Sequence, residues 1–202
     1  MRMKLPVVAV AVAALAAAAP ASAQYLSDTE KLIAAVEKRD GSTATQIMDS
    51  RGPRVLNTRN REGETALIAA INLHDPQWVG YLLQKGADPN YAAGDGDRPL
   101  VAAARIGFEQ AVEWLLAQGA EADGANRMGE TALIVAVQQR RGPIVEMLLD
   151  AGADPDKTDT AAGYSARDYA KRDSRSGQML ELIEAAGDKP KKVTDIDDFK
   201  LK

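Results

Sequence analysis

The hexapeptide Thr65-Ala66-Leu67-Ile68-Ala69-Ala70 decides the fold, because related copies of it recur twice more along the chain. The copies occupy residues 98–103 (RPLVAA) and 131–136 (TALIVA), so each follows the previous one by 33 residues. A second block, LLQKGAD at residues 82–88, recurs in the same register at 115–121 and 148–154. Two blocks repeated at one fixed interval indicate a stack of equivalent structural units.

These blocks resemble the ankyrin repeat, whose pattern is a glycine turn, Thr-Pro-Leu-His-x-Ala-Ala and a later Leu-Leu-x-x-Gly-Ala. The turn glycine recurs in step as Gly63, Gly96 and Gly129. The chain departs from the pattern at the motif histidine, where it has Ile68, Val101 and Ile134, and it keeps the motif proline only as Pro99. The resemblance implies an all-α ankyrin-repeat solenoid of about five helix-turn-helix repeats with connecting β-turn loops.

Two flanking units keep the spacing but have weaker motifs. Residues 32–35 (LIAA) stand upstream, and residues 163–166 (GYSA) restart the pattern downstream with one extra residue. An end repeat departs from the pattern because one of its faces must meet water. We therefore expect an ankyrin-repeat domain at 24–187, with repeats at about 26–57, 58–90, 91–123, 124–156 and 157–187.

Each unit carries signals for where its helices begin and end. Thr65, Thr131 and Ser165 have side-chain oxygens that can cap the first helix of a unit. Glycine tolerates the left-handed conformation that follows many helices. We expect it in that place at the end of each second helix: Gly86, Gly119, Gly152 and Gly187.

The first 23 residues have the pattern of a secretory signal peptide. Arg2 and Lys4 precede an apolar run, and the small residues Ala21 and Ala23 suit a signal peptidase. The run is short and rich in alanine, which disfavours a membrane anchor. We expect export by the general secretory route, cleavage after Ala23, and a mature protein in the periplasm or outside the cell, without a membrane span.

Residues 188–202 differ in composition from the repeats. Three lysines at 189–192 precede Asp195, Asp197 and Asp198, which predicts a flexible charged tail. The alternative is a short docking segment that uses the apolar side chains Ile196, Phe199 and Leu201.

Composition limits the chemistry. The chain lacks cysteine, which excludes disulfides and cysteine-based zinc sites, and its net charge of −4 argues against nucleic acid as a partner. The one histidine, His74, falls in the link between two predicted helices, and Gly94-Asp95-Gly96-Asp97 fits a turn better than a calcium loop. We predict no metal, no cofactor and no catalytic residue.

An ankyrin stack presents its turn tips and the outer side of its first helices as a concave strip, which by resemblance to the family binds the partner. We expect this strip to bind a protein, with Leu73, Ile106, Met128 and Tyr164 as apolar anchors. The full set is Arg61, Glu62, Glu64, Asn72, Leu73, Asp95, Asp97, Arg105, Ile106, Arg127, Met128, Glu130, Gln138, Gln139 and Tyr164.

Three functions fit these features to different degrees. The favoured one is a monomeric, non-catalytic module that binds a protein partner in the periplasm. A secreted effector that acts on host or competitor proteins is the alternative, and cellular location separates the two. A hydrolase built on the repeats would need a carboxylate or serine site that the sequence does not reveal.

The signal-peptide prediction is testable by N-terminal sequencing of the protein from an exporting bacterial host. We expect the mature chain to begin at Gln24, because signal peptidase selects small side chains at Ala21 and Ala23. An Ala23→Arg substitution should leave the precursor uncut, whereas Thr29→Arg, beyond the cleavage site, should not. Equal processing of both variants would contradict the prediction.

Overall fold

The computed structural model describes residues 27–173 and 177–187, so the predicted signal peptide and residues 188–202 lie outside the described part of the chain. The described residues form helix pairs with no β-strand between them. The first helices of the pairs are α1 (Asp28–Glu37), α3 (Ala66–Asn72), α5 (Pro99–Ile106), α7 (Ala132–Gln138) and α9 (Ala166–Arg172). The second helices are α2 (Gly41–Arg51), α4 (Pro76–Gln84), α6 (Glu109–Ala117), α8 (Gly142–Asp150) and α10 (Gly177–Gly187), and a 3-10 helix, η2 (Pro53–Asn57), follows α2.

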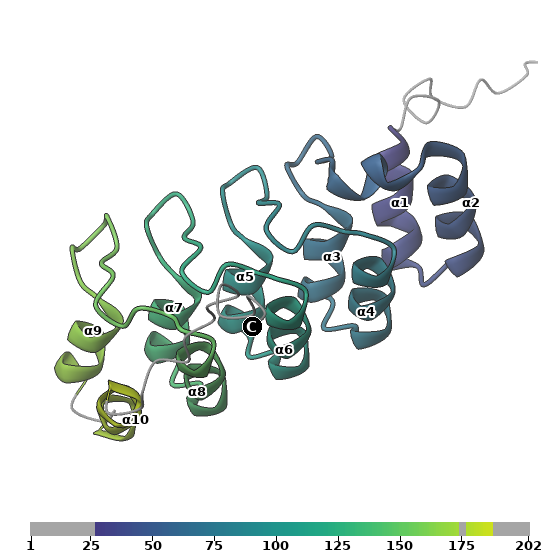
Figure 1. The fold of residues 1–202 in the computed structure, drawn as a ribbon. Coiled ribbons are helices and arrows are strands. Elements are labelled where there is room, and N and C mark those ends of the chain that lie inside the picture. Colours follow the sequence, from purple (N-terminus) through teal and green to yellow (C-terminus); the bar gives the residue numbers. More distant parts are fainter. Residues whose placement is uncertain (1–26, 174–176, 188–202) are drawn as a thin grey trace, which may run out of the picture.

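The five pairs stack in chain order and form an elongated two-layer solenoid (Figure 1). The first helices pack in sequence from α1 to α9, and α4, α6, α8 and α10 pack in sequence beside them. The loops that join successive pairs all project from the same edge of the stack, as Figure 1 shows. The prediction of an all-α solenoid with about five repeats is confirmed.

Buried alanines and large aliphatic side chains together form the core. Ala70, Ala103 and Ala136 are fully buried on the first helices, where their small side chains let neighbouring backbones approach. Large residues of both helix layers complete the core: Leu82, Leu115 and Leu148 on the second helices are 0% exposed, and Leu67 and Leu133 on the first helices are 2% and 0% exposed. Because these positions are equivalent in three repeats, one packing arrangement recurs along the stack.

The predicted helix caps are confirmed. The Thr65 hydroxyl accepts the Ile68 N–H at 3.2 Å, and Thr131 and Ser165 cap α7 and α9 in the same way. Gly86, Gly119 and Gly152 follow their helices with φ of 94°, 85° and 88°. The prediction for Gly187 is wrong by one position, because α10 has 11 residues where α4, α6 and α8 have 9, and so ends on this glycine.

Asn57, Asn90 and Asp123 form a row of hydrogen bonds, here called the asparagine ladder, that joins successive repeats along the loops after the second helices. Asn90 Oδ1 accepts the Glu121 N–H at 2.8 Å, and its Nδ2 donates to the Gly119 carbonyl at 3.0 Å. Asn57 makes the same two bonds one repeat earlier, and Asp123 accepts the Asp154 N–H at 2.7 Å one repeat later. The carboxylate of Asp123 has no hydrogen to donate to a glycine carbonyl, so at Asp123 the second of the two hydrogen bonds is missing.

A second ladder runs through the links between the two helices of a pair. The link residues Arg39, His74, Gly107 and Arg140 all have positive φ, between 53° and 76°. Each meets the following repeat. Arg39 Nε lies 2.9 Å from Asp75, the N-cap of α4, and the His74 ring stacks at 4.0 Å on Phe108, the N-cap of α6. The guanidinium of Arg141, the N-cap of α8, lies over Gly107, and Arg140 Nε lies 2.8 Å from Asp173, the C-cap of α9. The expected linker position of His74 is confirmed.

The asparagine ladder yields a pair of opposite stability predictions. Asn90→Ala should lower the free energy of unfolding by about 1–2 kcal/mol, because both of its bonds between repeats are lost. Asp123→Asn should raise it by about 0.5–1 kcal/mol, because the new amide can donate to the Gly152 carbonyl. Urea denaturation measures both, with the exposed Gln110→Ala as control. A destabilising Asp123→Asn would contradict the account of this ladder.

Candidate functional site

The loops between pairs end in turns, here called the first to fourth tips, at residues 60–64, 93–97, 126–130 and 159–164. In the third tip, Asn126 Oδ1 accepts the N–H groups of Met128 and Glu130 at 3.0 Å each, and Asn126 Nδ2 donates to the Glu130 carboxylate at 2.8 Å. The Asn126 N–H also donates to the Glu130 carbonyl, which closes the turn. The exposed side chains of Arg127 and Met128 are therefore carried on a fixed backbone.

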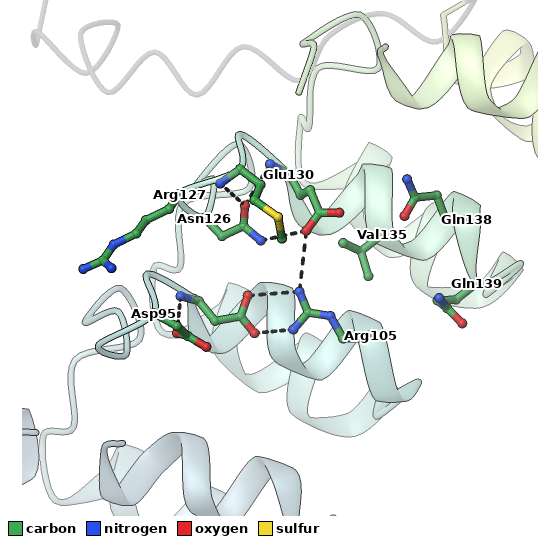
Figure 2. A pocket seen from close by; sticks show the side chains of 10 residues that line it. Asp95, Arg105, Asn126, Arg127, Glu130, Val135, Gln138 and Gln139 are labelled. Carbon is green, nitrogen blue, oxygen red and sulfur yellow. Dashed lines mark hydrogen bonds and ion pairs between the residues drawn. The ribbon is translucent and has the colours of Figure 1, made fainter. Parts of the chain in front are cut away.

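Arg105 ties the second tip to the third. Its guanidinium, at the end of α5, donates to both carboxylate oxygens of Asp97 in the second tip, as Figure 2 shows. The same group lies 3.8 Å from the Glu130 carboxylate in the third tip. Hydrogen bonding to Asp97 raises the pKa of Arg105, so the cation is held between its two acidic partners. Bidentate geometry makes this a strong and directional contact.

A hollow of about 400 Å³ opens beside this network, between α5 with the second tip and α7 with the third (Figure 2). Eight of the residues predicted for the strip line it: Asp95, Asp97, Arg105, Arg127, Met128, Glu130, Gln138 and Gln139. Two further lining residues, Asn126 and Val135, were not among those predicted. Asn126 was visible as a repeat of Asn60 two periods earlier, whereas Val135 belongs to the buried side of α7 and carries no polar signal.

The N-terminal part of the strip lies outside this hollow. Arg61 Nε is 3.4 Å from Glu30, and Glu62 accepts from Asn60 Nδ2 at 3.0 Å. Asn72 Nδ2 donates weakly to Glu64 at 3.4 Å. Partial burial raises the pKa of Glu64, and the nearby carboxylates Glu37 and Glu62 add to that effect although Asn72 opposes it.

The four expected apolar anchors differ in exposure. Leu73 and Met128 are 48% and 52% exposed, as expected of anchors. The expectation of exposure is wrong for Ile106, which packs against the core because it ends α5 just before the link. Tyr164 is also partly buried, with its ring edge-on to Tyr169 and beneath the guanidinium of Arg172.

The fourth tip, which carries Tyr164, is built differently because of its extra residue. The buried Asp159 accepts from Tyr169 Oη at 2.6 Å and from the N–H groups of Ala162 and Gly163. Burial alone would raise the pKa of Asp159, but these hydrogen bonds outweigh it and the pKa is lowered. The same contact raises the pKa of Tyr169 to about 12. This tip therefore closes around a carboxylate in place of an asparagine.

The predicted turn at residues 94–97 is confirmed, with the Asp97 N–H donating to Asp95 Oδ1 at 2.9 Å. Within residues 27–173 and 177–187, the acids and the histidine form no group of three or more that could hold a metal ion. In the same residues, no helix is both long and apolar enough to cross a bilayer.

Family models agree with this geometry. A model of three ankyrin repeats matches residues 79–159, and a single ankyrin-repeat model matches residues 62–93. No curated protein matches the chain significantly. This part of the chain therefore consists of ankyrin repeats, which generally mediate protein–protein interaction and are typically non-catalytic.

The raised pKa of Glu64 leads to a pH-dependent prediction. The folded state binds the Glu64 proton more tightly than the unfolded state, so ionised Glu64 destabilises the fold at neutral pH. Glu64→Gln should raise the melting temperature at pH 7. This gain should shrink as the pH falls, because Glu64 of the unsubstituted protein then becomes protonated and neutral. Thermal melts at several pH values measure it, with Glu109→Gln as control. A gain that grows toward low pH would refute the assignment.

Proposed function

We propose that this chain is a non-catalytic binding module that holds a protein partner against its concave strip in the periplasm. The observation that carries the proposal is the hollow beside Arg105, where residues of two adjacent repeats converge on one surface. The ankyrin repeats of residues 62–159 support a protein as the partner.

The side chains around the hollow are already held by ion pairs and hydrogen bonds, which favours binding to a preformed surface. Arg105 is paired with Asp97 and Glu130, and Asn126 fixes the third tip, so little side-chain freedom remains to be lost on association. Met128 stands half exposed at the edge of this rigid polar frame. An exposed apolar side chain with a polar rim is the usual composition of an interaction hot spot.

The proposed location rests on the N-terminal sequence. Residues 1–23 have the charged start, apolar run and small residues of a secretory signal, so we place the function in the periplasm. Osmotic-shock fractionation tests this part: we expect the protein in the periplasmic fraction, and recovery mainly from the medium would favour the secreted effector.

Site-specific photo-crosslinking in living cells tests the binding surface. A photoreactive amino acid at Met128 should give a crosslinked adduct of defined mass, because this exposed side chain belongs to the proposed contact surface. The same amino acid at Gln110, exposed on α6, serves as the matched control and should give none. Equal adducts at both positions, or none at Met128, would overturn the proposal.

Affinity for the captured protein then tests the role of the side chain. Met128→Ala should weaken binding about tenfold or more if the residue is a hot spot. Gln110→Ala should leave the affinity unchanged. An unchanged affinity in Met128→Ala would remove this residue from the interface.

A further inference from the structure

The last three second helices carry an exposed acidic face. Helices α6, α8 and α10 contain acidic residues but no lysine or arginine. Glu113, Glu146 and Glu181 occupy equivalent positions, each two residues before a fully buried Leu115, Leu148 or Ile183. Three further exposed carboxylates flank this row: Glu109, Asp150 and Glu184.

Neighbouring helices bring these like charges together. Helix α6 packs against α8, and α8 packs against α10, so the row runs across three adjacent helices. Interaxial distances of about 8–10 Å are comparable to the Debye length at physiological salt, so the carboxylates of neighbouring helices are only partly screened from one another. A cationic segment on this face would relieve their repulsion.

An apolar opening continues the face beyond α6. Gly80 of α4 lacks a side chain, and a Cβ there would lie 3.2 Å from the ring of Trp114 on α6. The opening of about 260 Å³ is lined by Gly80, Leu83, Gln84, Trp114, Ala117 and Gln118. Trp114 is partly buried and packs against the core from this side.

The chain itself supplies a segment with matching chemistry. Residues 188–202 follow α10 directly, with Lys189, Lys191 and Lys192 first and Phe199 further on. Two helix spacings of about 10 Å separate α10 from α6. The twelve residues from 188 to 199 can span about 40 Å when extended. This length is sufficient for Phe199 to reach Trp114 with the lysines along the acidic helices.

We propose that residues 188–202 dock on the second-helix face of their own chain, with the lysines of 189–192 against the carboxylates of α8 and α10 and Phe199 in the opening beside Trp114. Each exposed ion pair contributes little alone. The covalent connection, however, gives the segment an effective concentration of about millimolar or more at this face. The concave strip lies on the first helices and tips, so this docking leaves it open.

Zero-length crosslinking of the whole chain tests the lysine contacts. A carbodiimide joins lysine amines to carboxylates that touch them, and we expect links from Lys189, Lys191 or Lys192 to Glu146, Glu181 or Glu184 in low salt. The reaction is run on dilute monomer, and high salt should abolish the links. Links from these lysines only to Glu62, Glu64 or Asp95 of the strip, or only within residues 188–202, would overturn the proposal.

Tryptophan quenching tests the apolar contact separately. Trp78 is buried, so acrylamide chiefly reports the accessibility of Trp114. Phe199→Ala and the triple variant Lys189→Gln, Lys191→Gln, Lys192→Gln should both increase quenching. Lys31→Gln combined with Lys38→Gln, on the distant α1 and at its C-cap, is the control for charge and should have no effect. Unchanged quenching in the first two variants would refute docking at Trp114, whatever the strip binds.

Discussion

Close stacking of successive first helices is the constraint on which the rest of the structure depends. Ala70, Ala103 and Ala136 are fully buried where α3, α5 and α7 meet, and a larger side chain there would separate neighbouring repeats. One helix pair cannot bury its own apolar face, so the neighbours supply the core. Stability is therefore shared between adjacent repeats, and the alanine positions set their spacing.

Two ladders convert this stacking into a rigid scaffold. The asparagine ladder joins the loops after the second helices, and the link ladder joins the start of each second helix to the preceding repeat. Both act between successive repeats at opposite ends of the second helices. The first helices and tips are consequently held in register, and side chains from separate repeats can form one surface.

The candidate site lies where the repeats stop being equivalent. Position 105 is arginine where the neighbouring repeats have Asn72 and Gln138, and only the arginine can reach acids in two tips. Position 128 is methionine, whereas the equivalent positions in the two preceding repeats are Glu62 and Asp95. The regular positions build the frame, and these departures from regularity give the surface between α5 and α7 its particular chemistry.

The sequence by itself determined the repeat, the helix pairs, the caps at Thr65 and Thr131, and most of the residues around the hollow, because a 33-residue period places equivalent side chains on one edge. Only the tertiary structure decided that Arg105 reaches both Asp97 and Glu130 and that Ile106 turns into the core. It also decided that Glu113, Glu146 and Glu181 form one row. A period sets register along the chain, but the direction of a side chain and its partners in the next repeat depend on packing between helices.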